Sequence, residues 1–434
     1  MLENNKPLLV IECPCGTRSG YGERARDLVR SLIALDKYEI KIISTRWGST
    51  PMDALTENDS DIYSRLLTTN LATKPDIYVQ VTIPNEFRQM GKFNIGITAG
   101  IETTVCDSSW LEGCNRMDLI LVSSEHAKKV FVSTVYDKKD QSGNLVGSLR
   151  LEKPMEVLFE GVNLNKFTKI YNPNTPMDAW FKDMKEDFGF LFCGHWLAGD
   201  FGEDRKNVGG LIKTFLEAFK NKQNPPALIL KTSSGAPSIV DRDSIIDKIN
   251  AIRETVDSKV LPEIYLMYGN LTDEEINALY NHPKVKVHVS FTKGEGFGRP
   301  LIEAAVTGKP ILASNWSGQL DFLNKETSVL VDGKLTPVHP SAQWKGVINE
   351  GSEWFTIDYG IAGGYMKDMF KNYKKYSEMS RKTFHRIKTN FSFDVMTVKL
   401  GEILNKSVPE FPREVALKLP TLKKISLPTL KKVD

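Results

Sequence analysis

Residues 293–314 have the sequence KGEGFGRPLIEAAVTGKPILAS, and this stretch decides the predicted fold. Glycines at alternate positions form a loop whose backbone can approach a ligand closely, and Pro300 suits the first turn of a helix. The spacing predicts a helix over 300–306 and a strand over 310–313. A glycine loop that leads into a helix N-terminus offers free N–H groups and a partial positive charge. The stretch therefore predicts an α/β domain with a site for phosphate or a developing anion.

The same alternation of apolar runs and amphipathic stretches extends outward in two series, on either side of the linker YNPNTP at 171–176. Two successive series predict two doubly wound domains with a cleft between them. The expected strands are at 8–12, 39–44, 76–81, 94–99, 118–123, 156–159, 188–193, 227–231, 263–268, 285–289, 310–313 and 328–331. The expected helices are at 21–35, 125–136, 208–220, 243–254, 273–281 and 300–306, and further helix is expected along 365–404.

The chain is expected to divide into four regions. These are an N-terminal Rossmann-like domain (1–170), a C-terminal Rossmann-like domain (171–390), a final helix that packs back toward the first domain (391–407) and a basic tail (408–434). The tail repeats the unit LPTLKK at a period of eight residues, with a proline in each copy. It is expected to be flexible and solvated, and docking onto a partner or an acidic surface is the alternative.

The composition is that of an ordinary globular protein, with 434 residues of which 41% are hydrophobic and 26% charged. The net charge is +3, and the end of the chain is basic, so the body gives no electrostatic reason to expect general nucleic-acid binding. No apolar run approaches the roughly 18 residues of a membrane span, and the start lacks a signal-peptide pattern, so a cytoplasmic protein is expected. The cysteines are expected to be reduced and mostly buried; they are Cys13, Cys15, Cys106, Cys114 and Cys193.

Glu295 and Glu303 are the two carboxylates of the glycine-rich stretch. A hydrolase pair, one acid and one nucleophile, is one interpretation. On one straight helix, eight residues at about 1.5 Å each would separate their Cα atoms by about 12 Å, more than the 5–9.5 Å carboxyl spacing of glycosidases. Glu295 precedes the helix, which makes this argument suggestive only. Two ionised carboxylates that accept hydrogen bonds from separate hydroxyl groups of one extended ligand fit better.

The pattern EGFGRPLIEA at 295–304, followed by GKPILASNWSG at 308–318, resembles the donor-site signature of the retaining family 4 glycosyltransferases. The resemblance covers most of residues 156–405 and is specific for the second half, whereas the first half matches loosely. It implies the GT-B architecture, two Rossmann-like doubly wound domains with an interdomain cleft. The further segments that carry it are EGVNLNKF at 160–167, GHW at 194–196, RKNV at 205–208, YGNLTDEEINALY at 268–280 and NFSF at 390–393.

The resemblance implies a role for each matching residue. Glu303 would hold the ribose hydroxyls of a nucleotide-sugar donor, and Glu295 would lie against the transferred sugar. Lys206 would stabilise the diphosphate as it leaves. Backbone amides around Phe297 and Gly298 would contact sugar and phosphate. The remaining donor-side positions that it implies are Gly20 and Gly22 in the N-domain glycine loop, Gly269 and Asn270 beside the base, Gly296 and Leu301.

The sequence departs from the family pattern at two places. An arginine commonly follows the glycine at the start of the second domain, but here Gly194 is followed by His195. Arg205 is a plausible substitute for the second phosphate-binding cation, and Lys231 is a weaker one. The histidine often found on the acceptor side is absent, and Glu102 in ITAGIETT resembles a branch of the family with Glu-Thr at this point. Glu102 is therefore assigned to the acceptor side.

The resemblance, together with the glycine loop and the cations beside it, implies a hexosyltransferase that moves a sugar from a nucleotide-diphosphate donor to a hydroxyl acceptor with retention of configuration. No metal or other cofactor is expected, because lysine, arginine and helix termini supply the positive charge. The acceptor could be a glycan, a lipid or a protein, and a nucleic acid is possible but has no support. Two alternatives remain open. One is a GT-B hydrolase or epimerase of nucleotide sugars, and the other is a non-catalytic nucleotide-sugar-binding protein whose tail docks a partner.

Overall fold

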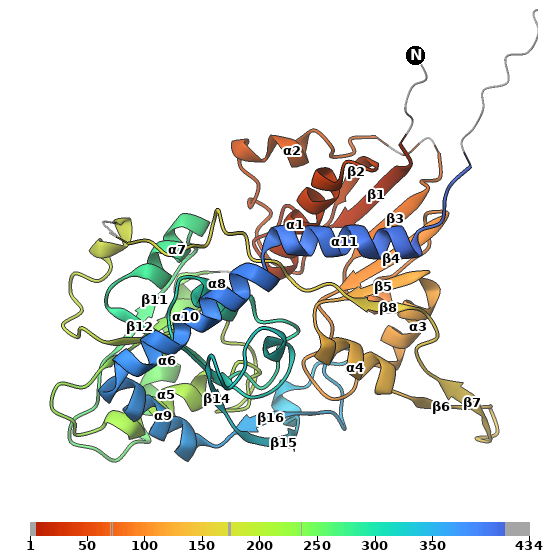
Figure 1. The fold of residues 1–434 in the computed structure, drawn as a ribbon. Helices are drawn as coiled ribbons and strands as arrows, with labels where there is room; N and C mark the ends of the chain where they lie inside the picture. Colours follow the sequence, from red (N-terminus) through yellow and green to blue (C-terminus); the bar gives the residue numbers. More distant parts are fainter. Residues whose placement is uncertain (1–5, 70, 72, 172–174, 236, 413–434) are drawn as a thin grey trace, which may run out of the picture.

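The computed structural model describes residues 6–69, 71, 73–171, 175–235 and 237–412. Two six-stranded parallel sheets form its framework, one in each lobe (Figure 1). The first sheet has the order β2-β1-β3-β4-β5-β8, with bounds Glu39–Ser44, Leu8–Cys13, Ile77–Val81, Phe93–Thr98, Leu119–Val122 and Met155–Val157. The second has the order β11-β10-β9-β12-β13-β14, with bounds Ile264–Met267, Ala227–Lys231, Gly189–Cys193, Val285–Ser290, Ile311–Ser314 and Val329–Val331.

The strand order reverses once in each sheet, between β1 and β3 in the first and between β9 and β12 in the second. Ligands of open α/β sheets bind outside the carboxyl ends of the strands at such a reversal. In the second sheet, β9 is followed by the loop that carries Arg205 and Lys206, and β12 is followed by the glycine-rich loop at 293–298. The topology therefore brings three of the four predicted catalytic residues, Arg205, Lys206 and Glu295, to one edge of the sheet.

The helices connect successive strands or cover the sheets. They are α1 (Gly20–Leu35), α2 (Ser60–Tyr63), α3 (Ser108–Arg116), α4 (Glu125–Ser133), α5 (Val208–Phe219), α6 (Ile239–Glu254), α7 (Asp273–Asn281), α8 (Arg299–Val306), α9 (Tyr359–Lys371), α10 (Tyr373–Asn390) and α11 (Phe393–Ser407). Side-chain caps define several starts: Ser19 accepts from the backbone N–H of Gly22, and Thr272 and Glu275 form a capping box on α7.

Two sequence expectations need correction. The helix expected to end near Tyr136 ends at Ser133, because Tyr136 begins β6 (Tyr136–Lys139), which pairs with β7 (Leu145–Leu149) as an antiparallel hairpin. The hairpin extends from the first lobe (Figure 1). The sequence pattern missed it, together with a second pair of strands, β15 (Gly333–Pro337) and β16 (Glu353–Ile357). The helical segment 365–404 is broken near Asn372 and again at Ser392, which caps α11.

The last helix, α11, crosses back to the first lobe and lies along α1 (Figure 1). Ser31 Oγ and Thr397 Oγ1 share a hydrogen bond of 2.8 Å, and a Cβ at Gly401 would meet a methyl of Leu35 at 2.9 Å. One cluster of buried apolar side chains runs through both sheets and includes Met396 and Leu400 of α11. The two lobes therefore share a core as well as a polar interface.

The five cysteines are free and buried, as expected. Among the described residues, no helix combines the length and the hydropathy that crossing a bilayer requires. The LPTLKK repeat lies outside the described residues, as do residues 172–174 of the predicted linker.

Candidate functional site

The four predicted catalytic residues form one charged group, to which the loops after β9 and β12 contribute three residues and the first lobe contributes Glu102. Lys206 Nζ lies 2.5 Å from Glu295 Oε1, and Arg205 Nη1 lies 3.3 Å from Glu295 Oε2. The same Arg205 nitrogen lies 3.4 Å from Glu102 Oε1, which belongs to the other lobe. The group thus contains two cations and two carboxylates, and Arg205 joins the lobes.

The backbone fixes these side chains from both loops. Asn207, which precedes α5, adopts a left-handed φ of 53°, and the N–H of Lys293 donates to the carbonyl of Arg205 at 2.7 Å. The N–H of Glu295 donates to Ser317 Oγ at 2.9 Å, and Arg205 Nη1 donates to the carbonyl of Gly294 at 2.8 Å. The two loops are therefore tied to each other by hydrogen bonds that do not involve the carboxylates.

Burial and ion pairing shift the pKa values of these charged side chains in opposite directions. Burial would raise the pKa of Glu295, but the charges of Lys206 and Arg205 outweigh it, so that pKa lies below its ordinary value. Burial lowers the pKa of Lys206, although Glu295 opposes the shift. For Arg205, the nearby Glu102 and Glu295 outweigh burial and raise the pKa. An incoming anion would compete with Glu295 for the two cations.

The glycine-rich loop packs directly against the backbone of the first lobe. A Cβ at Gly294 would lie 1.9 Å from the carbonyl oxygen of Glu102, and one at Gly296 would lie 2.6 Å from the carbonyl oxygen of Ala99. Ser123 Oγ donates to the carbonyl of Gly296 at 3.4 Å. Glycine at 294 and 296 therefore permits the close approach of the two lobes at this point.

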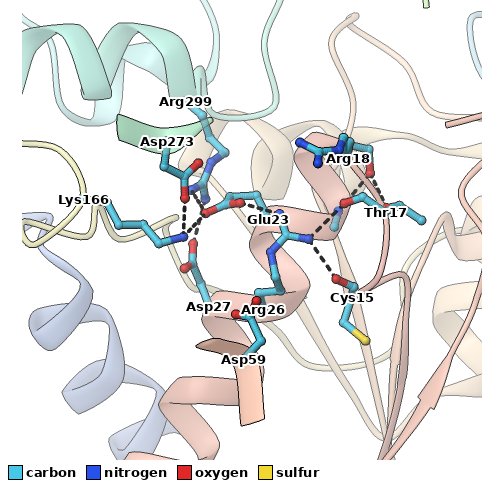
Figure 2. A network of polar contacts seen from close by, with 12 residues as sticks. Cys15, Thr17, Arg18, Glu23, Arg26, Asp27, Asp59, Lys166, Asp273 and Arg299 are labelled. Atoms are coloured by element: carbon cyan, nitrogen blue, oxygen red, sulfur yellow. Dashed lines mark hydrogen bonds and ion pairs between the residues drawn. The ribbon is translucent and has the colours of Figure 1, made fainter. Parts of the chain in front are cut away.

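Glu303 lies in a second charged group, which Figure 2 shows in part. Its Oε1 lies 3.6 Å from Nε of Arg299, one turn earlier on α8, and its Oε2 accepts a hydrogen bond of 3.4 Å from Tyr280. Burial raises the pKa of Glu303 to about 8, although Arg299 opposes the shift. Arg299 also reaches three carboxylates of the first lobe, Asp27 at 3.0 Å, Glu160 at 3.3 Å and Glu23 at 3.7 Å.

The other predicted donor residues lie in different surroundings. Gly20 is exposed at the start of α1 with open space beside it, whereas Gly22 is buried against Thr17. Gly298 has a φ of 100° and precedes α8. Phe297 and Leu301 are each 2% exposed, so both side chains are packed in the core and only their backbone could meet a ligand.

Four further positions lie at or just after the ends of the strands β9, β10 and β11. Lys231 ends β10, and burial lowers its pKa. His195, after β9, has Nδ1 3.3 Å from Ser233 Oγ, and burial lowers its pKa as well. Gly269 after β11 has a φ of 106°, and Asn270 is exposed.

Sequence reasoning missed Arg299 and its partners. The only signal was an arginine at the one variable position inside the pattern EGFGxP, which gives no hint of the residue that it contacts. Glu23 and Asp27 lie on α1, and Lys166 follows the first domain's last strand. Their convergence with Arg299 depends on how the lobes meet, which no local pattern records.

The raised pKa of Glu303 predicts a pH-dependent stability. A carboxyl whose pKa rises from about 4.3 in the unfolded chain to about 8 in the fold stabilises the protein below pH 4.3, and this contribution is lost as the pH approaches 8. The side chain of Glu303→Gln stays neutral at every pH. We therefore expect the free energy of unfolding of this variant, relative to that of the wild type, to increase by up to roughly 1 kcal/mol for each pH unit between 4.3 and 8. Denaturant unfolding at pH 5, 6, 7 and 8 measures the difference. The exposed Glu254→Gln serves as control, and a constant difference for Glu303→Gln would contradict the assignment.

A cavity of about 700 Å³ lies between the loop at 201–203, α5 and α9. Its lining includes Glu203 and Lys293 and none of the predicted donor-site residues. In the described part of the chain, no group of three or more His, Cys, Asp or Glu side chains is placed to hold a metal ion. The expectation that no metal takes part stays a prediction.

Residues 251–348 match the sequence model of the glycosyl transferases group 1 family. A search of curated proteins found no match. Among solved structures, sucrose-phosphate synthase from Thermosynechococcus elongatus has a TM-score of 0.59 at 13% identity, covering 93% of this chain and 99% of that one. A glycosyltransferase from Rickettsia africae has a TM-score of 0.60 at 15% identity, covering 93% and 98%. HepE from Anabaena, solved with UDP-glucose, has a TM-score of 0.58 at 11% identity, covering 92% and 100%. These likenesses confirm the expected fold class, two Rossmann-like α/β domains of the GT-B type.

Proposed function

We propose that this chain is a retaining glycosyltransferase that transfers a hexosyl group from a nucleotide-diphosphate sugar to a hydroxyl acceptor. The observation that carries the proposal is the pairing of Lys206 and Arg205 with Glu295 at the reversal of strand order in the second sheet. Two buried cations at this point suit a diphosphate, because anions bind at the carboxyl ends of the strands and at the helix termini that follow. The family match at 251–348 supports the same class of reaction.

In the proposed step, the bond between the sugar C1 and the diphosphate oxygen breaks, and a bond between C1 and the acceptor oxygen forms on the same face. The departing diphosphate oxygen takes the proton of the acceptor hydroxyl, so no dedicated side-chain base is needed. Lys206 and Arg205 stabilise the negative charge that develops on the diphosphate. The enzyme contributes position and charge, and these two cations fill the electrostatic role in place of a divalent ion.

Glu295 changes partners in this scheme. Its carboxylate holds Lys206 at 2.5 Å, and a bound diphosphate would replace it as the partner of that ammonium group. The freed carboxylate can then accept hydrogen bonds from hydroxyl groups of the sugar. Glu303 would accept from the ribose hydroxyls. Glu102, on the opposite lobe and 3.4 Å from Arg205, would face the acceptor.

Two other functions are distinguishable from this one. A nucleotide-sugar hydrolase or epimerase would consume donor when no acceptor is added, and a binding protein would consume none. The expected result for a transferase is that donor consumption depends on the acceptor. Assays with and without a mixture of glycan, lipid and peptide acceptors separate the three cases.

The first test is thermal stability against UDP, GDP, ADP, dTDP and CMP sugars, with Glu303→Ala beside the wild type. A ligand at about 100 times its dissociation constant stabilises the fold by about 2.7 kcal/mol, so one nucleotide should raise the wild-type melting temperature visibly. The shift should shrink in Glu303→Ala and persist in the exposed control Glu254→Gln. An equal shift in Glu303→Ala would remove the ribose assignment, and no shift with any sugar would favour a different function.

A further inference from the structure

Arg299 is the first residue of α8, yet most of its contacts lie in the other lobe (Figure 2). Its Nη1 lies 3.0 Å from Asp27 Oδ2 and 3.3 Å from Glu160 Oε2, and its Nη2 lies 3.7 Å from Glu23 Oε1. The guanidinium is 14% exposed, and Asp27 and Glu160 are 2% and 6% exposed. One side chain of the second lobe thus enters a buried acidic site on the first.

The two buried carboxylates depend on this arginine. Among the described residues, Asp27 and Glu160 have Arg299 as their one ion-pair partner. Glu23 is shared more widely, because it also pairs with Arg26 at 2.5 Å and with Lys166 at 3.2 Å. A buried carboxylate that loses its cation is costly, so separation of the lobes requires Asp27 and Glu160 to be hydrated or protonated. Arg299 therefore favours the closed arrangement over a partly opened one.

The same guanidinium contacts the proposed nucleotide site. Its Nε lies 3.6 Å from Oε1 of Glu303, four residues later on α8. Through this contact, Arg299 orients the carboxylate and opposes the effect of burial on it. Closure of the lobes fixes the guanidinium between Glu303 on one side and Asp27 and Glu160 on the other. A nucleotide that binds the Glu303 carboxylate in this orientation binds the closed form better than the open form.

We propose that Arg299 is a positioning residue that couples nucleotide binding at Glu303 to closure of the two lobes. The inference rests on the proposed function for the nucleotide, while the closure itself rests on the ion pairs alone. Coupling between two such equilibria is reciprocal, so closure strengthens nucleotide binding by the factor by which nucleotide favours closure. Couplings of this kind typically amount to about 5- to 150-fold.

The test compares Arg299→Leu, Arg299→Lys and the double variant Asp27→Asn, Glu160→Gln with the wild type. Arg242→Leu is the matched control, since Arg242 is exposed on α6 and its one ion-pair partner within the described ranges is its neighbour Asp243. Small-angle X-ray scattering without nucleotide should give a larger radius of gyration for Arg299→Leu and for the double variant. Arg299→Lys should lie between them and the wild type, because one ammonium group cannot reach all the carboxylates. The control should match the wild type.

Calorimetric titration with UDP, GDP, ADP and dTDP then measures the coupling. The nucleotide that binds the wild type should bind Arg299→Leu about 5- to 150-fold more weakly, and it should reduce the radius of gyration of the opened variants. Wild-type values for both the radius and the affinity would overturn the proposal, and an open variant with unchanged affinity would overturn the coupling. If Arg299→Leu fails to fold, the double variant decides, because it keeps the arginine. If the wild type binds none of these four nucleoside diphosphates, the proposed function and the coupling fail, and the scattering still decides whether Arg299 holds the lobes together.

Discussion

Replacing Lys206 with alanine should lower kcat/KM for sugar transfer by about 100- to 1000-fold while the protein remains folded. Lys206 Nζ is the cation closest to Glu295, at 2.5 Å, and its side chain is 12% exposed. Its charge acts where the diphosphate develops negative charge, and a buried charge stabilises that state more than an exposed one. The fold should survive, because Glu295 keeps Arg205 as a partner at 3.3 Å.

The measurement is the initial rate of transfer with the donor that the stability panel identifies. Affinity for the nucleoside without phosphates should stay near the wild-type value, whereas affinity for the nucleoside diphosphate should fall. Lys220→Ala is the control, since Lys220 lies at the other end of α5 and pairs with Glu217 at the surface. Full activity in a folded Lys206→Ala enzyme would refute the assignment of Lys206 to the diphosphate.

Gly294→Ala should reduce transfer by about 100-fold and destabilise the protein by roughly 1–3 kcal/mol. The added methyl would lie 1.9 Å from the carbonyl oxygen of Glu102 and 2.8 Å from its carbonyl carbon. Both atoms belong to backbone, which cannot turn aside as a flexible side chain can. The lobes must therefore move apart where Arg205 joins Glu102 to Glu295, and a displacement of about 1 Å in such a site costs about two orders of magnitude in rate.

Gly364→Ala provides a matched glycine-to-alanine control, because a Cβ at Gly364 on α9 meets nothing within 4 Å. Alanine in a helix is favoured over glycine, so this control should be as stable as the wild type or more so. Thermal unfolding and transfer rates measure both variants side by side. Equal stability and activity for Gly294→Ala and Gly364→Ala would mean that the lobes do not meet at Glu102 in solution.

Local sequence patterns sufficed for the framework of the fold. Buried strands such as Ala227–Lys231 and helices such as Asp273–Asn281 have bounds that apolar periodicity and a capping box define, and both were predicted with the observed ends. The β6–β7 hairpin was not predicted from the sequence, because nearly all of its residues are exposed and the apolar pattern that marks a strand is therefore missing. The breaks in the helical segment 365–404 were not predicted either, because no proline marks them.

Some residues of the candidate site were predictable from the sequence, and others were not. Lys206, Glu295 and Glu303 lie in recognisable motifs, and the structure brings Lys206 and Glu295 together. The role of Arg299 was not predictable, because its partners Asp27 and Glu160 lie about 270 and 140 residues earlier in the chain. Only the packing of the two lobes brings these charges together, and a single sequence holds no record of such pairs. These ion pairs matter for stability because their charges are buried, and burial also depends on the whole fold.

The return of α11 to the first lobe means that this lobe is built from two segments that lie far apart in the sequence. Leu35 of α1 packs against Gly401 of α11. At synthesis rates of 5–20 residues per second, the roughly 360 residues between α1 and α11 take about 20–70 s to emerge from the ribosome. During that interval, the face of the first lobe that α11 covers is open to water and to chaperones. The first lobe, although made first, is completed last, so a truncation that removes α11 should impair the domain that precedes it by more than 200 residues.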